Sequence, residues 1–172
     1  PQDVSKLRYG SVMIMADQDV DGSHIKGLVI NWLDVYAPSL LRRPGFIKVF
    51  QTPIVRCTKR QQTREFFSVP EYEQWKQQTP DHPSWKQKYF KGLGTSTAAD
   101  SKRYFSQLNK YVIPYLYMQG QEESIDKAFR RARAADRRQW LSNPANDAGL
   151  VTPRNATEFV DKELVLFGLA SV

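Results

Sequence analysis

Three aspartates lie within five residues near the start of the chain, in the segment SVMIMADQDVDGSH at residues 11–24. Val12 to Ala16 form a short apolar run that predicts a buried strand, and Asp17, Asp19 and Asp21 follow it directly. The carboxylates are therefore expected at the carboxyl end of a strand, which is the edge where open α/β sheets bind their ligands.

A divalent cation is an economical explanation for three neighbouring carboxylates. Two unit charges about 4 Å apart repel by roughly 4 kcal/mol at an effective dielectric constant near 20, and a metal ion screens that repulsion. Oxygen ligands without a nearby cysteine favour magnesium, manganese or calcium over zinc. The alternative is a solvated acidic turn, in which an aspartate caps the next helix and Gly22 provides a positive φ.

Two other motifs match the acidic segment less well. The three aspartates and Gly22 match the first ligand positions and the glycine of an EF-hand loop. The last ligand of that loop must be a bidentate Glu, but its place falls on Leu28, and a predicted strand stands where an EF-hand needs a helix. The DxDx[TV] motif of haloacid-dehalogenase-like phosphatases is a poor match, because Asp21 occupies the place of its Thr or Val.

Hydrophobic periodicity predicts a helix directly after the acidic segment. Its apolar residues recur at helical spacing on one face, at Ile25, Leu28, Val29, Trp32 and Tyr36. The same kind of reading predicts strands at 46–58 (bent at Pro53), 65–68, 85–90 and 112–117, helices at 71–78, 98–108, 122–141 and 158–167 (capped by Thr157), and a linker or loop at 143–155.

Two glycines and two hydroxyl residues follow the predicted strand at 85–90, in the segment KGLGTS at 91–96. The backbone N–H groups of such a loop could hold an anion, with Lys91 adding positive charge. The spacing is not that of a Walker P-loop. A simple turn in which Ser or Thr caps the next helix is an equally good interpretation.

Positive charge is concentrated in the predicted helix at 122–141, where residues 127–138 contain six basic residues and one aspartate. Charge of one sign at this density repels itself unless a polyanion is near, so contact with DNA or RNA and a solvated charged face both remain open. The whole chain has 25 Lys and Arg against 18 Asp and Glu, and its net charge of +7 also favours a polyanionic partner.

Length and composition are those of an ordinary globular protein: 172 residues, 41% hydrophobic and 25% charged, enough for one or two compact units. No apolar run is long enough to predict a membrane span, and no signal-peptide layout is present. The single cysteine, Cys57, cannot form an internal disulfide, which fits a reducing compartment. The chain begins without a start signal and ends in an apolar segment, so we expect it to be a piece of a longer polypeptide.

An ordered set of segments resembles the metal-binding TOPRIM region of type IIA DNA topoisomerases. The segments are DQDVDGSHIKGL at 17–28, TPIV at 52–55, YFKGLGTST at 89–97, DRRQWL at 136–141 and KELVLF at 162–167. The resemblance covers nearly the whole chain. The sequences HIKG and GTST resemble those of the eukaryotic enzymes more than those of bacterial gyrase.

The resemblance implies part of an ATP-dependent isomerase that breaks both strands of one DNA duplex, passes a second duplex through the break and reseals it. Asp17 and Asp19 would be Mg²⁺ ligands, with Asp21 as a supporting ligand, and Mn²⁺ or Ca²⁺ could substitute. The residues that would contact or lie near DNA are Arg137, Arg138, Lys162 and Lys91.

Other parts of the family's machinery are expected outside this chain: the catalytic Glu, the nucleophilic Tyr and the ATPase domain that binds ATP. The fragment alone is therefore predicted to be inactive, with no catalytic residues beyond the metal ligands. The parent enzyme would be a homodimer acting on double-stranded DNA, most simply in the nucleus, with a mitochondrial or viral origin left open.

The predicted fold is α/β, a Rossmann-like TOPRIM parallel sheet with helices on both faces. Residues 1–142 would form a partial TOPRIM domain whose N-terminal part lies outside the chain, and 143–172 a loop and helix leading to the winged-helix DNA-gate domain. The rival interpretation is a non-catalytic nucleic-acid-binding α/β module whose acidic turn is structural. Dependence on a divalent metal separates the two.

Overall fold

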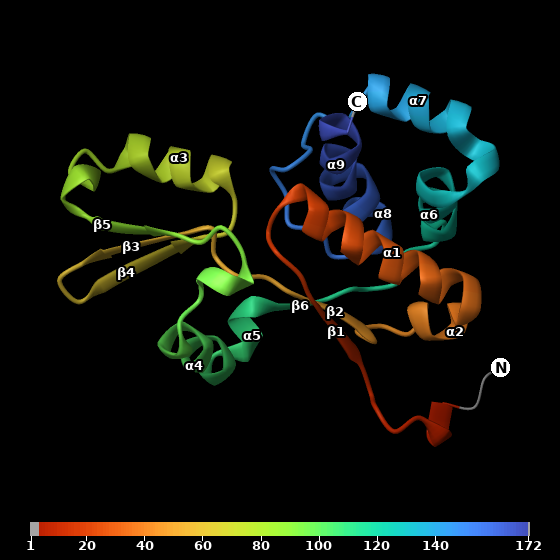
Figure 1. The fold of residues 1–172 in the computed structure, drawn as a ribbon, viewed down its shortest axis with the longest axis horizontal. Coiled ribbons are helices and arrows are strands. Elements are labelled where there is room, and N and C mark those ends of the chain that lie inside the picture. The colour runs from red at the N-terminus through yellow and green to blue at the C-terminus, as the bar shows by residue number, and fades with distance from the viewer. Residues whose placement is uncertain (1–3, 172) are drawn as a thin grey trace.

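Two small sheets form the framework of the molecule (Figure 1). The computed structural model describes residues 4–171, and in it the first sheet has the strand order β1-β2-β6 and the second the order β4-β3-β5. The α/β class is therefore confirmed. The strands are β1 (Val12–Met15), β2 (Ile47–Phe50), β3 (Val55–Lys59), β4 (Gln62–Phe66), β5 (Lys86–Tyr89) and β6 (Val112–Pro114).

Helices gather on one side of the first sheet, where α1, α2 and α6 to α9 lie together, while α3 covers the second sheet and α4 and α5 lie between the two (Figure 1). The helices are α1 (Val20–Tyr36), α2 (Pro38–Leu41), α3 (Val69–Gln78), α4 (Ala98–Ser106), α5 (Leu108–Tyr111), α6 (Gln121–Phe129), α7 (Ala134–Ser142), α8 (Ala156–Glu158), the π-helix η5 (Phe159–Leu164) and α9 (Val165–Ala170). Short 3₁₀ segments are η1 (Val4–Lys6), η2 (His82–Ser84), η3 (Leu93–Thr95) and η4 (Arg131–Arg133).

The first sheet is mixed rather than all parallel. β1 and β2 are parallel, with Val12 opposite Ile47, and α1 connects them as expected for a βαβ unit. β6 is antiparallel to β2, with Val49 opposite Ile113. The chain returns at β6 from the second sheet in the opposite direction, and an antiparallel edge strand on a parallel pair is a common arrangement.

The second sheet is antiparallel, with β3 in the middle between β4 and β5. Lys59 pairs with Gln62, so β3 and β4 are joined by a two-residue turn, in which Arg60 has a φ of 54°. The strand predicted at 65–68 starts earlier in the structure, at Gln62. The prediction missed this start because the first residues of the strand are exposed and polar and show no apolar alternation. The core under this sheet consists of Val55, Cys57, Phe66, Tyr72 and Trp85.

The main hydrophobic core joins the first sheet to the helices. Ile14 of β1, Ile30 of α1 and Val49 of β2 pack in one cluster with Phe159 and Leu164 of η5. The C-terminal helical segment thus contributes to the same core as the acidic turn's flanking elements. The division at 142/143 stays a prediction.

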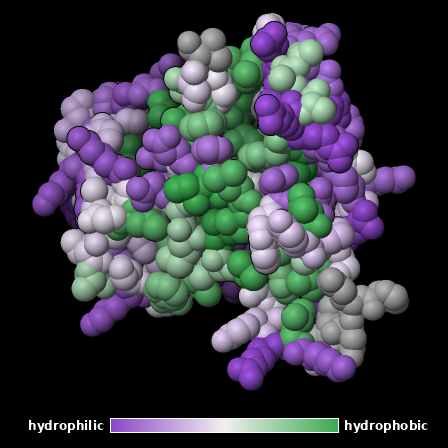
Figure 2. Space-filling view, turned by 45° about the vertical axis from the view of Figure 1, so that its right-hand side comes forward, coloured by the Kyte–Doolittle hydropathy of each residue, from purple (hydrophilic) through white to green (hydrophobic). Residues whose placement is uncertain are grey.

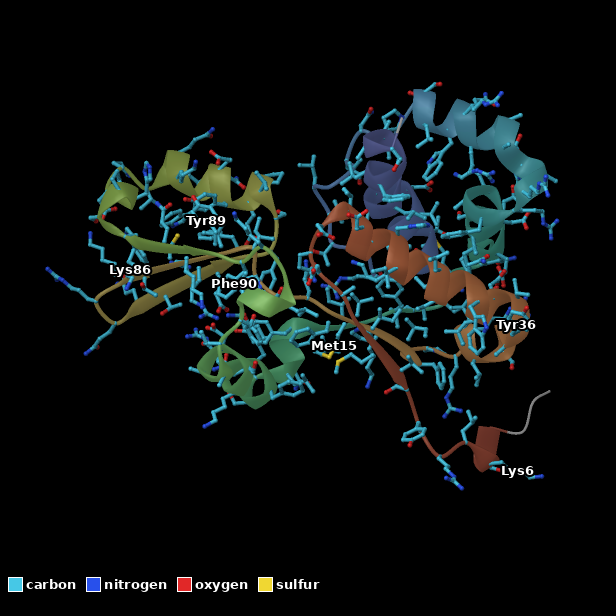
Figure 3. All side chains as sticks on the ribbon, in the orientation of Figure 1. Lys6, Met15, Tyr36, Lys86, Tyr89 and Phe90 are labelled. Atoms are coloured by element: carbon cyan, nitrogen blue, oxygen red, sulfur yellow. The ribbon has the colours of Figure 1, made fainter. Side chains whose placement is uncertain are left out.

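The apolar face that periodicity predicted for α1 is mostly not buried. Ile25 is 54% exposed, Trp32 56% and Tyr36 68%, and Figure 3 shows Tyr36 on the outside at the end of α1. The face that packs inward instead contains Gly27, whose missing Cβ lets the ring of Phe129 approach; a Cβ there would lie 2.6 Å from Cζ. The exposed residues, which we call the α1 stripe, are Ile25, Leu28, Trp32, Val35 and Tyr36. Figure 2 shows a broad hydrophobic patch in the middle of the face turned to the viewer.

The single basic helix predicted at 122–141 is wrong, because the chain breaks between α6 and α7. Arg130 is extended, with φ −69° and ψ 126°. The guanidinium of Arg137 stabilises the break, since it donates hydrogen bonds to the carbonyls of Lys127 (3.2 Å) and Arg130 (2.6 Å) at the end of α6. Sequence periodicity does not detect such a contact.

The last helical segment is capped by Asn155 and not by Thr157 as predicted. Asn155 Oδ1 accepts a hydrogen bond from the Glu158 N–H (2.9 Å), which starts α8. The preceding segment 143–155 is tied to η5, because the Gly149 N–H donates to the Lys162 carbonyl (2.7 Å). Among the described residues no helix is long and apolar enough to span a membrane.

Candidate functional site

The acidic turn begins where β1 ends. Ala16 is buried and Asp17 is exposed, so the turn leaves the core within one residue. Gly22 packs against this turn; a Cβ on it would lie 2.0 Å from the backbone oxygen of Asp17. Its φ is not positive, so glycine is needed here for close approach rather than for a left-handed backbone.

Asp19 and Asp21 have different environments. Asp19 is the N-cap of α1, and its Oδ1 accepts a hydrogen bond from the Gly22 N–H at 2.7 Å. Asp21 lies in the first turn of the same helix and is exposed. The alternative to a metal site was a turn in which an aspartate caps the next helix, and the structure confirms this capping role for Asp19.

Asp17 is held by the glycine loop, which we define as residues 91–97. The Leu93 N–H donates to Asp17 Oδ1 (2.7 Å), and the carboxylate lies against Gly92, where a Cβ would be 2.8 Å from Cγ and from both oxygens. The anion that this loop binds is therefore a carboxylate of the same chain. The helix-cap interpretation is also correct, because Thr97 and Asp100 form a capping box at the start of α4.

The donor set of the turn suits a hard cation, but it is incomplete. Asp17 and Asp19 each use Oδ1 for a backbone N–H, and in the described part of the chain their Oδ2 atoms have no hydrogen bond. Within residues 4–171, however, no group of three or more His, Cys, Asp or Glu side chains is arranged to hold a metal ion. The three aspartates therefore do not converge, and a complete oxygen shell would need ligands from elsewhere.

A cleft of about 370 Å³ opens beside the acidic turn. Its lining brings Asp19 and Ser23 to the same opening as Lys162 and Glu163 of η5, with Gln51 from the end of β2. Ser23 Oγ donates to Glu163 Oε1 (2.6 Å), and the buried Lys26 ammonium forms an ion pair with the same oxygen. The cleft therefore joins the turn to the C-terminal helical segment.

The four basic residues predicted to contact DNA are engaged to different degrees. Lys162 forms an ion pair with Asp147 (2.8 Å), which raises the pKa of Lys162, and Arg137 binds carbonyls of the α6 end. Arg138 and Lys91 are exposed and have no ion-pair partner among residues 4–171. Half of the basic residues in the run at 127–138 are compensated, since Lys127, Arg130 and Arg133 pair with carboxylates.

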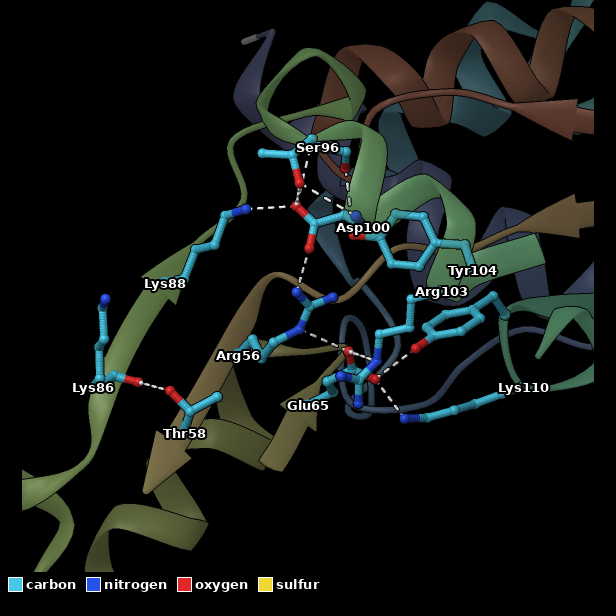
Figure 4. A network of polar contacts seen from close by, with 12 residues as sticks. Arg56, Thr58, Glu65, Lys86, Lys88, Ser96, Asp100, Arg103, Tyr104 and Lys110 are labelled. Atoms are coloured by element: carbon cyan, nitrogen blue, oxygen red, sulfur yellow. Dashed lines mark hydrogen bonds and ion pairs between the residues drawn. The ribbon is translucent and has the colours of Figure 1, made fainter. Parts of the chain in front are cut away.

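A buried polar network that sequence reasoning missed lies behind the glycine loop (Figure 4). Asp100, almost fully buried, accepts from Lys88 Nζ (2.6 Å) and pairs with Arg56, which also binds Glu65 (2.8 Å). Burial acts to raise the pKa of Asp100, but hydrogen bonds from Lys88, Thr97 and Arg56 outweigh it and hold that pKa well below its ordinary value. The only local signal was the spacing Thr97-x-x-Asp100, a capping-box pattern.

Comparison with known proteins gives a consistent family. The family model for TOPRIM_C, the C-terminal associated domain of TOPRIM, matches residues 50–172. The chain is 44% identical to human DNA topoisomerase 2-alpha over 94% of its length, 41% identical to chicken DNA topoisomerase 2-beta over 97%, and 51% identical to Plasmodium falciparum DNA topoisomerase 2 over 82%. It spans only 12%, 11% and 10% of these relatives, respectively.

A solved structure shows the same fold. The DNA-binding, cleavage and re-ligation domain of Plasmodium falciparum topoisomerase II superposes with a TM-score of 0.89 at 45% identity. The match covers 98% of this chain and 23% of that one.

Proposed function

We propose, because the chain belongs to the TOPRIM_C family in the form found in type IIA DNA topoisomerases, that it is the metal-binding part of an ATP-dependent DNA topoisomerase. The parent enzyme would break both strands of one duplex, pass a second duplex and reseal the break. It would act as a homodimer on double-stranded DNA in the nucleus and bind ATP outside this chain. The three relatives named above all come from eukaryotes.

The observation that carries the proposal is the placement of the acidic turn. Asp17 is held from below by the glycine loop, so its Oδ2 is left for a cation, and Asp19 lies at a cleft that Lys162 also lines. Carboxylate oxygens without a second hydrogen bond suit a divalent cation, and oxygens of a bound phosphodiester could complete the shell of that cation.

Magnesium is the proposed metal, with Mn²⁺ or Ca²⁺ as substitutes. Asp17 and Asp19 would hold it, with Asp21 in support, and further oxygen ligands would come from the parent chain and the DNA. A bound divalent ion at this position supplies charge neutralisation at the scissile phosphate. Asp19 would combine two roles, because its Oδ1 caps α1.

DNA contact is proposed for Arg138, Lys162 and Lys91, and for Arg137 in addition to its structural role. Arg138 and Lys91 are the better candidates, since their side chains are exposed and unpaired in the described residues. Lys162 would exchange Asp147 for a phosphate, which requires that this partly exposed ion pair open.

We also propose that the parent chain completes the first sheet, as a partial TOPRIM domain at 1–142 requires. β1 is an edge strand in the described residues, and its free side could accept another strand. The α1 stripe lies on the helix that follows β1, and an exposed stripe of large apolar residues is typical of an interface. A further strand and helix from the parent chain would cover both.

The rival function, a non-catalytic nucleic-acid-binding module, is favoured by one observation: Asp19 already has a structural role as a helix cap. Substitutions at this residue separate the two functions. Asn caps a helix as well as Asp, so Asp19→Asn removes the charge and keeps the cap, whereas Asp19→Ala removes both.

The test uses the full-length parent enzyme, with DNA cleavage and DNA binding measured separately. We expect Asp17→Ala and Asp19→Asn to abolish cleavage and leave DNA binding largely intact, and Asp21→Ala to reduce cleavage less. Asp81→Ala, a distant exposed aspartate, is the control and should cleave normally. Normal cleavage by Asp19→Asn together with loss in Asp19→Ala would favour the structural turn instead.

A further inference from the structure

We propose that the glycine loop is a cradle that fixes the orientation of the Asp17 carboxylate, and that the Arg56–Asp100 pair is what holds the cradle in place. Gly92 and the Leu93 N–H would then be positioning groups for the metal site, and Arg56 and Asp100 would act through them. The inference rests on the proposed role of Asp17 as a metal ligand.

The contact itself is close and specific. The Leu93 N–H uses one oxygen of Asp17 at 2.7 Å, and Gly92 lies flat against the carboxylate, with room for hydrogen but not for a methyl group. Together they restrict the rotation of the carboxylate, and in the described residues Oδ2 has no hydrogen bond. Hydrogen bonds of this kind to a ligating carboxylate usually set both its orientation and the affinity for the metal.

The loop is anchored at both ends to the second sheet. At its start, the Phe90 N–H donates to the Ile54 carbonyl (2.9 Å), and Figure 3 shows Phe90 where β5 leads into the loop. At its end, Asp100 accepts hydrogen bonds from the Thr97 N–H (2.9 Å) and hydroxyl (2.8 Å). The partner at the start of the loop, Ile54, directly precedes β3, and the partner of Asp100, Arg56, lies in β3.

Arg56 connects these anchors. Its guanidinium pairs with Asp100, the capping-box partner of Thr97 at the start of α4 (Figure 4). The same guanidinium lies 5.0 Å from the centre of the Phe90 ring. Lys88 approaches the same two groups, Asp100 at 2.6 Å and the Phe90 ring at 4.6 Å. One buried arginine therefore touches the residues that bound the loop on both sides.

The second sheet contributes no proposed metal ligand, but its contacts fix both ends of the glycine loop. If the loop were free to move, a clash at Gly92 would be relieved by the backbone. Because the loop is anchored, the clash must be relieved by the Asp17 carboxylate, which then leaves the orientation that the Leu93 N–H holds.

Two alanine substitutions in the same loop test the cradle. A Cβ at Gly92 would meet the Asp17 carboxylate at 2.8 Å, whereas a Cβ at Gly94 would meet no atom within 4 Å. Gly92→Ala and Gly94→Ala therefore add the same methyl group to the same loop, and only the first brings it against Asp17. Arg56→Met tests the anchor without touching Asp17.

The first measurement needs no metal. In the NMR spectrum of the 172-residue chain, the Leu93 amide proton should move upfield in Asp17→Ala and in Gly92→Ala, and stay in place in Gly94→Ala. The second measurement is Mn²⁺ affinity, followed by paramagnetic broadening. We expect the Mn²⁺ dissociation constant to rise about 10-fold or more in Gly92→Ala, the usual effect of losing such a partner, by less in Arg56→Met, and to be unchanged in Gly94→Ala.

Thermal melts of each variant show whether it is folded at the temperature of the binding experiment. Equal Mn²⁺ affinities for the two alanine variants, with binding abolished by Asp17→Ala, would overturn the cradle while leaving the proposed function intact. Undiminished binding by Asp17→Ala would overturn the metal assignment and the cradle together. A weaker Gly92→Ala beside a normal Gly94→Ala supports the cradle.

Discussion

Replacing Arg56 by methionine should lower the free energy of unfolding by roughly 2–3 kcal/mol. The Arg56 side chain is 10% exposed and makes charge-assisted hydrogen bonds to Glu65 and Asp100. Each such bond stabilises by about 1.5–3 kcal/mol. The gain is partly offset because Arg56 Nη2 is buried without a partner in the described structure, which costs about 1–3 kcal/mol. Methionine fills a similar space and removes both effects.

The assay is urea unfolding of the 172-residue chain, followed by circular dichroism and repeated as a thermal melt. A loss of 2–3 kcal/mol corresponds to a fall of roughly 4–12 °C in Tm for a chain of this size. Arg64→Met is the control, because Arg64 lies on the neighbouring strand β4, is exposed and has no ion pair among residues 4–171. It should change stability by no more than about 0.5 kcal/mol. Equal effects of the two substitutions would refute the reasoning.

The same network predicts how stability depends on pH. The pKa of Asp100 in the folded chain is lower than its ordinary value of 3.8, so the charged carboxylate stabilises the fold at neutral pH. That contribution is present above pH 3.8 and is lost as pH falls through the lowered pKa. The stability difference between the wild type and Asp100→Asn should therefore shrink when the unfolding curves are measured below about pH 4, and a constant difference down to pH 2 would contradict this assignment.

Two further predictions concern surfaces of the helices. In the parent enzyme, Arg138→Ala should reduce the slope of log affinity for DNA against log salt by about 0.9 without changing the Tm. Arg137→Ala should lower the Tm, because it removes the hydrogen bonds to the carbonyls at the end of α6. Identical behaviour of the two variants in both assays would be evidence against this division of roles. Trp32→Glu should leave the Tm of the 172-residue chain within about 2 °C, because the side chain is half exposed, and should reduce self-association in sedimentation velocity if the α1 stripe is an uncovered interface.

Sequence reasoning located the chemistry but not the contacts that organise it. The strand, the acidic turn and the helix after it were predicted from local patterns, and so was the glycine loop with its capping hydroxyl. The contact between Leu93 and Asp17 joins residues 76 positions apart. It depends on how the second sheet sits beside the first, and no local pattern encodes that orientation.

The error in predicting which face of α1 is buried has a different physical cause. Periodicity finds an apolar stripe, but it does not say whether the stripe faces the core of the same chain or a partner. The face that α1 buries contains Ser23, Lys26 and Gly27, which sequence patterns read as polar or neutral. Lys26 is buried because Glu163 pairs with it, and Gly27 because a ring fills its place. Both reasons lie in distant elements.

The basic run at 127–138 shows why charge density alone does not identify a DNA-binding face. Three of its six cations pair with carboxylates, and a fourth, Arg137, stabilises a break in the helix that the pattern had concealed. The next residue, Arg138, has the same side chain but no ion pair in the described residues, so residue type alone does not distinguish the two. Only the position of the α6 carbonyls distinguishes the two residues, so the part of a basic run that remains free for a phosphate is decided by the packing of the chain's own helices.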